Sequence, residues 1–314
     1  MSALPIVAKA AGWIYTLAWG IGFYPPLLTN IKLWSIQGLS MDFIYFNHFG
    51  YVLYTIYYGM LRFNSCVRQQ YSDRYTLPSD PSPRMPLIKT NDFLFALHGL
   101  CVQSVLISQA YWWGFAKNDN QIVSKTCKRA ISSVVLYGVG MGLYVYHTGG
   151  DNPIGWEWLD LFTSLGLLKI AMSVCKNIPQ IYYNYKRKST HGWPIVMIWL
   201  DCVGAVLSLT QLVIDAIEVG DLKSVFNNLP KFLLSVEASL ADIVFFLQHY
   251  YWYYNADVQR YGDYKAGLAE DEQFLEEHRH DHDHLLENEE TGTSQEQVCS
   301  VKSTDEGEMQ RLLI

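Results

Sequence analysis

The stretch "NIPQIYYNYKRKSTHG", residues 177–192, places Pro179 and Gln180 inside an apolar run that is long enough to cross a membrane. A related stretch, "GFYPPLLTNIKLWSIQG", occupies residues 22–38. Proline lacks the backbone N–H and clashes with the preceding helical turn, so it kinks a helix and frees a carbonyl group. In lipid, such groups are tolerated only where they face protein or a water-filled cavity. The sequence therefore predicts two kinked membrane helices beside a central cavity.

The two stretches belong to an internal repeat. With Pro25 aligned to Pro179, an offset of 154 residues, six positions coincide without a gap: Pro25/Pro179, Asn30/Asn184, Lys32/Lys186, Ser35/Ser189, Gly38/Gly192 and Gly50/Gly204. The segments "NDFLFALHG" (91–99) and "ADIVFFLQH" (241–249) agree more loosely. This symmetry favours hinges at Pro25, Pro179 and Gln180 over kinks that serve packing alone.

Seven apolar runs have about the length of a membrane helix, and they cover residues 11–31, 42–61, 92–115, 130–147, 156–185, 193–217 and 232–254. With the repeat, they predict an all-α membrane protein of two parallel three-helix units joined by a linker helix, an arrangement that some transporters use. The expected parts are a short segment 1–10, a first repeat 11–115, the linker helix 130–147, a second repeat 156–254 and a tail 255–314.

Charge is unevenly distributed along the chain. Residues from Asn255 onward carry 16 acidic and 5 basic side chains, whereas the preceding 254 residues carry 14 and 18. Such an acidic tail is predicted to be disordered. Seven spans put the termini on opposite sides, and the basic loops favour a cytosolic C-terminus and a lumenal N-terminus. No leader-like segment opens the chain, so the first apolar segment is expected to stay as a membrane helix.

Two carboxylates lie midway through predicted spans. Asp201 lies in "IVMIWLDCVGAVLSL" and Asp242 in "VEASLADIVFFLQ", and neither has a basic residue within one helical turn. A carboxylate at the bilayer centre costs about 2.5 kcal/mol or more. Each is therefore expected either to meet a partner from another helix or to be protonated part of the time. A hydrogen-bonded packing role is the alternative.

Further polar residues lie in or near the predicted spans. They are Asn30 and Asn184 just after the prolines, Asn47 in the second span, Lys176 one turn before the kink, and Lys231 at the start of the last span. Amides bond both carboxylate and ammonium groups and lysines bond carboxylates, so these residues are candidate ligands of an amino acid. Snorkelling to the interface is the alternative for the lysines. Asp42 either joins the carboxylates of the site or caps the second span.

The repeat, together with "YKRKSTHGW", "WLDCVGAVLSLTQ", "LADIVFFLQHYYWY", "GLSMDF" and "FALHG", resembles the PQ-loop family and, within it, the cystinosins. The resemblance covers residues 12–254 and implies a proton-coupled carrier of L-cystine in the lysosomal or vacuolar membrane, with no cofactor. It further implies proton coupling at Asp201, supported by Asp242 and Asp42, and substrate handling by Asn184, Lys176 and Lys231.

In the cycle that the resemblance implies, Asp201 takes up a proton from the acidic lumen and cystine binds. The two halves then rock about Pro25 and Pro179, and both ligands leave to the cytosol. The first repeat departs from the family because Pro26 stands where a glutamine is usual. We expect the hinge to survive there and the role of that glutamine to be lost.

The tail carries two matches to the acidic-dileucine sorting pattern, "DHDHLL" (281–286) and "EMQRLL" (308–313). Their key residues are Asp281, Leu285, Leu286, Glu308, Leu312 and Leu313, and cytosolic sorting adaptors are the expected partners. Four alternating histidines, 278 to 284, follow a pattern that a divalent metal can use. A solvated run is the preferred interpretation, so no metal site is predicted.

Other functions fit the sequence less well. A seven-helix receptor would show no internal repeat, and an enzyme would need a nucleophile–base pair or a metal cluster that the spans do not offer. A carrier of cationic or other amino acids within the same family is the nearest alternative, although the candidate lysines favour cystine. Membrane lipid is an expected partner, and nucleic acid is not.

Overall fold

A computed structural model describes residues 4–76, 85–86, 88, 90–149, 155–219, 225 and 229–256. The chain divides into two units, Met1–Asp257 and Val258–Ile314, and all described residues belong to the first. The disorder, the sorting signals and the histidine run predicted for the tail therefore lie outside the described residues.

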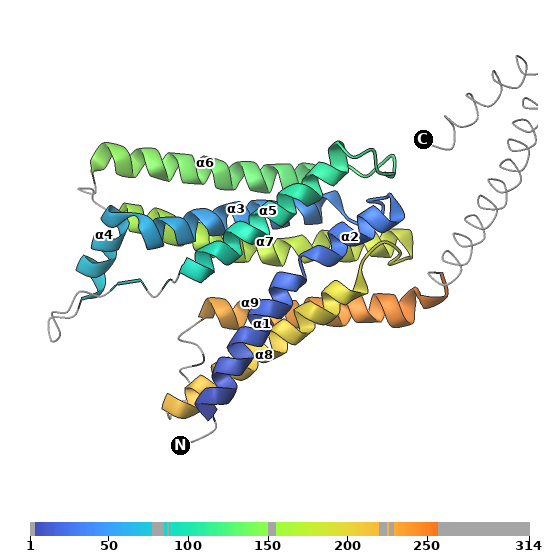
Figure 1. The fold of residues 1–314 in the computed structure, drawn as a ribbon. Helices are drawn as coiled ribbons and strands as arrows, with labels where there is room; N and C mark the ends of the chain where they lie inside the picture. The colour runs from blue at the N-terminus through green and yellow to red at the C-terminus, as the bar shows by residue number, and fades with distance from the viewer. Residues whose placement is uncertain are drawn as a thin grey trace, which may run out of the picture. The chain divides into compact units, whose positions relative to one another are not determined.

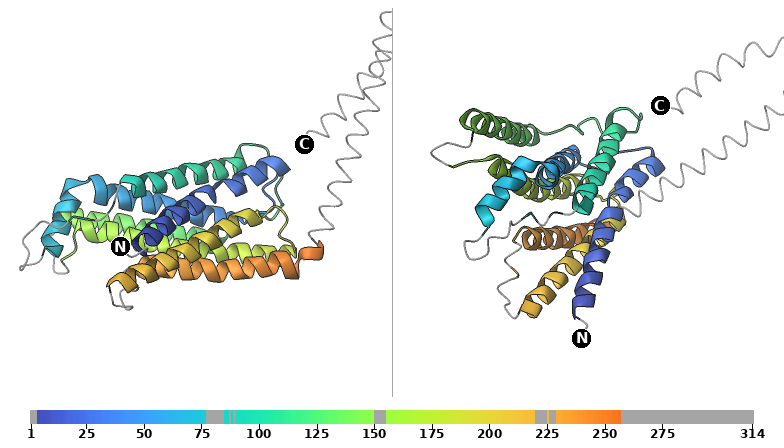
Figure 2. Two further views of the ribbon diagram at one scale, coloured as in Figure 1. Left: turned by 60° about the horizontal axis from the view of Figure 1, so that its bottom comes forward. Right: turned by 60° about the vertical axis from the view of Figure 1, so that its left-hand side comes forward.

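Regular structure in the described residues is helical, apart from one isolated parallel bridge between Ser35 and Ala116. The order is α1 (Leu4–Ile21), α2 (Tyr24–Leu33), α3 (Met41–Phe63), α4 (Ser65–Tyr75), α5 (Thr90–Tyr111), α6 (Lys125–Thr148), α7 (Trp158–Arg187), α8 (Ile195–Val219), α9 (Leu229–Leu247) and the π-helical turn η2 (Gln248–Trp252). In Figure 1, α6 lies at the upper edge, α3, α5 and α7 lie beneath it, and α1, α8 and α9 lie along the lower side. The left view of Figure 2 shows the long helices running along a common direction.

Six helical stretches are long and apolar enough to cross a membrane: Ile6–Leu33, Asp92–Tyr111, Lys125–Thr148, Trp158–Arg187, Ile195–Ile217 and Phe232–Trp252. They confirm six of the seven predicted spans. The other predicted span, 42–61, forms the 23-residue helix α3, which is not among the six. Its composition is less apolar because Asn47, His48 and several tyrosines stand where aliphatic residues are usual in a span.

The two predicted kinks differ in form. In the first half, the helix ends at Ile21 and restarts at Tyr24, so that Pro25 and Pro26 lie in the first turn of α2. Proline is tolerated there because a first-turn N–H has no partner within the helix. In the second half, Pro179 lies inside the uninterrupted 30-residue helix α7. A single proline removes one hydrogen bond from α7, whereas two adjacent prolines would remove two.

The two halves of the repeat pack against each other through two related contacts. Helix α3 packs on α7, and α1 packs on α8. A Cβ added to Gly50 on α3 would lie 3.4 Å from the Met172 Cβ on α7, and one added to Gly204 on α8 would lie 2.3 Å from Trp19 Nε1 on α1. Gly50 and Gly204 are partners in the repeat. The symmetry of the sequence therefore extends to the packing.

The loops that follow α2 and α7 meet at another repeat pair, Gly38 and Gly192. A Cβ on Gly38 would lie 2.1 Å from the carbonyl carbon of Gly192, and Gly192 has a φ of 77°. Glycine permits both the close approach and the left-handed conformation. This pair is the point at which the loops of the two halves touch.

A buried amide pair joins each repeated stretch to the last helical segment of its half. Asn30 Nδ2 donates to Gln109 Oε1 (2.9 Å), and Gln109 Nε2 donates to the carbonyl three residues before Asn30 (3.1 Å). In the second half, Asn184 Nδ2 donates to Gln248 Oε1 (3.0 Å), and Gln248 Nε2 donates to the carbonyl three residues before Asn184 (2.9 Å). The same four-group pattern is thus built twice.

Gln180 adds a further set of bonds in the second half. Its Oε1 accepts a hydrogen bond from Ser40 N (2.6 Å). Its Nε2 donates to the Gly38 carbonyl (3.0 Å) and to Asn184 Oδ1 (2.9 Å). We call these bonds the Gln180 latch, because they tie α7 to the loop and the N-terminus of α3 in the first half.

The first half lacks the equivalent latch. The residues 154 positions before Gln180 and after Ser40 are Pro26 and Pro194. Pro26 has no amide side chain, and Pro194 has no N–H to donate. Asn30 Oδ1 is accordingly buried without a hydrogen-bond partner among the described residues. The acceptor equivalent to Gln180 and the donor equivalent to Ser40 are thus both missing in the first half. The contact between α2 and the start of α8 therefore lacks the latch that ties α7 to the start of α3. We call these two contacts the junctions between the halves.

The polar helix α4 ties the first half to the start of α7. The Arg74 guanidinium pairs with Asp160 and also with Glu157 (2.8 Å), and Gln70 Oε1 accepts a hydrogen bond from Leu159 N (3.0 Å). The two carboxylates also form a capping box at the N-terminus of α7. Helix α4 is thereby held against the second half.

Replacement of Asn184 by Leu is expected to destabilise the protein more than replacement of Asn30 by Leu. Asn184→Leu breaks two buried side-chain hydrogen bonds and Asn30→Leu breaks one. Each polar group left buried and unpaired costs about 1–3 kcal/mol. Thermal unfolding of the purified variants in detergent measures this difference as a lower Tm for Asn184→Leu. Equal losses of Tm would contradict a stabilising role for the bond from Gln180.

Candidate functional site

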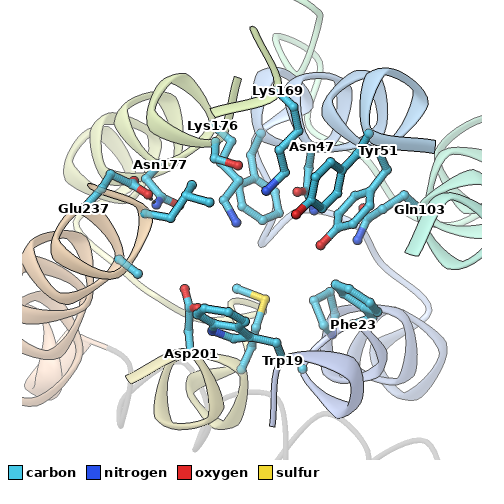
Figure 3. A pocket seen from close by; sticks show the side chains of 18 of the residues that line it. Trp19, Phe23, Asn47, Tyr51, Gln103, Lys169, Lys176, Asn177, Asp201 and Glu237 are labelled. Carbon is cyan, nitrogen blue, oxygen red and sulfur yellow. Dashed lines mark hydrogen bonds between the residues drawn. The ribbon is translucent and has the colours of Figure 1, made fainter. Parts of the chain in front are cut away.

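A cavity of about 150 Å³ lies between the two halves. This volume is roughly ten times what one water molecule needs, so the cavity has room for a small molecule. Its lining comes from α1, α2, α3, α5, α7, α8, α9 and the turn between α1 and α2, and no described residue of α6 takes part. In Figure 3, Lys169, Lys176, Asn47 and Tyr51 lie along one side, Glu237 and Gln103 lie at opposite ends, and Asp201, Trp19 and Phe23 face them from below.

Four charged side chains of the described residues line the cavity, and their formal charges balance. Lys169 and Lys176 lie two turns apart on one face of α7, Asp201 comes from α8, and Glu237 comes from α9. Glu237 Oε1 accepts a hydrogen bond from Asn177 Nδ2 (2.7 Å). Two carboxylates therefore offset two ammonium groups in a region where an isolated charge is expensive.

The two lysines contact aromatic rings as well. Lys169 Nζ lies 4.6 Å from the centroid of the Tyr54 ring, and Lys176 Nζ lies 5.8 Å from that of Phe43. A cation over an aromatic face is attracted by the ring quadrupole. Among the described residues, no ion pair joins these lysines to the carboxylates of the cavity. Their N–H groups are therefore available to an anionic group of a ligand.

The first half contributes neutral polar groups to the lining. They are Asn47 and Tyr51 from α3, Gln103 from α5 and Trp19 from α1. Asn47 is the repeat partner of Asp201, since 154 residues separate them. Trp19 Nε1 and Gln103 Oε1 are buried without hydrogen-bond partners among the described residues. The charged groups thus come from the second half and the neutral ones mostly from the first.

The structure brings three of the predicted site residues to the cavity: Lys176, Asp201 and Asn47. Asp242 is not among the lining residues. It lies one turn along α9 from Ala238, which does line the cavity, and it is 2% exposed. Its Oδ2 has no hydrogen-bond partner within the described part of the chain. Asp242 is therefore a sealed carboxyl group next to the cavity wall.

Other predicted residues have partners elsewhere. Asp42 Oδ1 accepts a hydrogen bond from Ser124 N (2.7 Å), so it joins the start of α3 to the start of α6. Asn30 and Asn184 do not line the cavity, and the amide pairs described above use their side chains. The side chain of Lys231 lies outside the described residues.

The predicted hinge residues also lie outside the cavity lining. Neither Pro25 nor Pro179 is among the lining residues, and Gln180 is fully occupied by the latch. Pro26, the departure from the usual Pro-Gln pair, does line the cavity. The unlatched junction of the first half therefore borders the site at Pro26.

Sequence reasoning missed Lys169, Glu237, Asn177 and Gln103. Lys169 lies in the apolar run "LGLLKIAMSVCK", seven residues before Lys176, and Glu237 lies five residues before Asp242. An ionisable residue within a span is a functional candidate by default, so this rule would have found the first two. The amides carry no such local signal.

The fold and the cavity define a helical membrane protein whose central polar site is shared by two repeated halves. The family model of the PQ loop repeat matches residues 7–65 and 161–220. The second match begins 154 residues after the first, which is the offset of the internal repeat.

Curated proteins agree with this class. The chain is 34% identical over 256 residues to a cystinosin homolog of Caenorhabditis elegans, a match that covers 81% of this chain and 59% of the relative. It is 33% identical over 261 residues to a cystinosin homolog of Dictyostelium discoideum, with 83% and 86% covered. A cystine transporter of Saccharomyces cerevisiae is 29% identical over 244 residues, with 76% and 90% covered. This chain belongs to the cystinosin family of PQ-loop proteins.

Removing the charge of Lys176, of Glu237, or of both residues tests the charge balance of the cavity. Lys176→Gln and Glu237→Gln are each expected to destabilise the protein by roughly 1–3 kcal/mol, because each leaves one charge uncompensated. The double variant restores the balance, so its loss should be smaller than the sum of the two single losses. Tm values of the wild type and the three variants measure this coupling. Additive losses would contradict the balance.

Proposed function

We propose that the protein is a proton-coupled transporter that exports cystine from an acidic lysosomal or vacuolar lumen to the cytosol. The observation that carries this proposal is the charge-balanced cavity between the two halves, in a chain whose relatives are named cystinosins and cystine transporter. L-Cystine carries two ammonium and two carboxylate groups. A site with lysines, carboxylates and amides on facing helices complements these groups.

In this proposal, α3 is the seventh membrane span. It packs against α5 and α7, and its residues Asn47, Tyr51 and Tyr54 line the cavity. Polar residues that face a cavity are compatible with a span of lower hydropathy. One unit then consists of α1–α2, α3 and α5, the other of α7, α8 and α9, and α6 links them. Parallel repeats of this kind are one of the architectures of secondary transporters.

Rocking of the two units would open the cavity to one side at a time. The units touch through the loops at Gly38 and Gly192, and the Gln180 latch reinforces one of the two junctions. The junction of Pro26 and Pro194 has no such latch. We therefore expect α2 and the start of α8 to separate more easily than α7 and the start of α3.

Asp201 is the proposed proton carrier, because its carboxyl group lines the cavity from the second turn of α8, within a membrane span. Asp242 is a second carboxyl group, buried beside the cavity wall. Opening of the site would expose it to water and could change its protonation state. Asp42 is assigned to holding the start of α6, as its bond to Ser124 N indicates. A pH difference of two units supplies about 2.7 kcal/mol per proton, which is enough for roughly hundredfold accumulation.

Replacement of Asp201 by Asn is expected to abolish the stimulation of cystine uptake by an acid-outside gradient. The amide keeps the size of the side chain but cannot carry a proton, so uptake in the variant should not respond to the gradient. Radiolabelled cystine uptake by purified protein in liposomes, with the gradient present or absent, measures the effect. Lysine and arginine uptake in the same liposomes tests the alternative substrates.

Asp215→Asn is the matched control, because Asp215 lies on the same helix, is exposed and does not line the cavity. It should retain the stimulation. Stimulated uptake that persists in Asp201→Asn would rule out Asp201 as the proton carrier. If the wild-type protein transported lysine or arginine but not cystine, the assignment of cystine as the substrate would be wrong.

A further inference from the structure

Gln103 is a buried amide in the wall of the cavity. It lies on α5, is 3% exposed and lines the cavity. Its Oε1 has no hydrogen-bond partner among the described residues. Figure 3 shows Gln103 on the side of the cavity that lies opposite Glu237. A buried acceptor of this kind is exceptional in proteins, because it loses water without gaining a partner.

Gln109 shows that α5 can bury a glutamine without leaving it unpaired. It lies six residues further along the same helix and is 1% exposed. Its Oε1 accepts from Asn30 and its Nε2 donates to the Leu27 carbonyl. The two glutamines therefore share residue type, helix and burial, and they differ in that Gln103 faces the cavity. The free acceptor of Gln103 points to a ligand and not to a structural bond.

The cavity has two unlike ends. Lys176 and Glu237 at one end are charged and come from the second half, whereas Gln103 at the opposite end is neutral and comes from the first half; Lys169 and Asn47 lie between the two ends. Cystine, in contrast, has two identical ends, each with one ammonium and one carboxylate group. The charged end offers partners for one such group pair, and the neutral amide of Gln103 lies at the opposite end, where the other pair would lie.

We propose that Gln103 is a specificity-determining residue that binds the second α-amino acid end of the substrate. Its Oε1 accepts from the ammonium group, and its Nε2 donates to the carboxylate group. One amide provides both an acceptor and donors, and it does so without disturbing the balance of two lysines and two carboxylates in the cavity. The substrate class is a molecule with two α-amino acid groups joined through a disulfide. This inference rests on the proposed function.

The test compares Gln103→Met with Gln109→Met in liposomes. Methionine keeps the length of glutamine and removes its hydrogen-bonding groups. Two quantities are measured for each protein: the half-saturating concentration of cystine uptake, and the inhibition of that uptake by S-(methylthio)cysteine, a disulfide with only one amino acid end. In Gln103→Met, the half-saturating concentration of cystine should rise about tenfold, equivalent to about 1.4 kcal/mol, while inhibition by the one-ended disulfide stays as in the wild type.

Gln109→Met separates recognition from folding. It should lower Tm, because it breaks the pair with Asn30, and it should leave the ratio between the two ligands unchanged. Gln103→Asn provides a second variant if Gln103→Met does not fold, since it keeps a buried amide but withdraws it by one methylene group. It should shift the same ratio in the same direction.

The outcomes distinguish this inference from the function on which it rests. If the wild type takes up cystine and the Gln103 variants keep its preference for the two-ended substrate, the role of Gln103 is overturned and the transport function stands. An equal loss for both ligands also overturns it, because a general disturbance of the cavity would act on either. Absence of cystine uptake by the wild type overturns both proposals.

Discussion

A polar group inside a bilayer must find its partner within the protein, and the rest of this molecule depends on that constraint. The backbone near each repeated stretch is met by a glutamine from the last helical segment of the same half, held in turn by Asn30 or Asn184. The charges on α7 are balanced by carboxylates on α8 and α9 that line the same cavity without forming ion pairs with them among the described residues. Polar side chains are thus gathered inward, and the outward faces of the spans are left to apolar residues.

The internal symmetry is kept where it serves packing and broken where the cavity lies. Glycine pairs repeat at the helix crossings, and the Asn–Gln pairs repeat with the same donors and acceptors. In contrast, the repeat partner of Asp201 is the neutral Asn47, and the latch of Gln180 has no counterpart at Pro26. Departures from a local rule tend to collect at functional sites. Two equal halves would give the cavity two equal ends and two equal junctions, and the described residues show neither.

Much of the fold could be predicted from the sequence, because span length and the repeat depend on local composition. Six spans and the internal repeat follow from it. The position of Asp201 and Lys176 at the cavity also follows, since a charge in a span must face inward. The amide partners of Asn30 and Asn184 could not be predicted, because they lie 79 and 64 residues away and their register depends on tertiary packing.

The central claim is that a double-ended amino acid bridges the two halves within this cavity. The most direct measurement is a structure of the full chain in lipid determined with cystine at acidic pH by electron cryomicroscopy. The account predicts one cystine with one end at Lys176 and Glu237 and the other end at Gln103. Cystine that bound outside the cavity, or that touched only the second half, would contradict it.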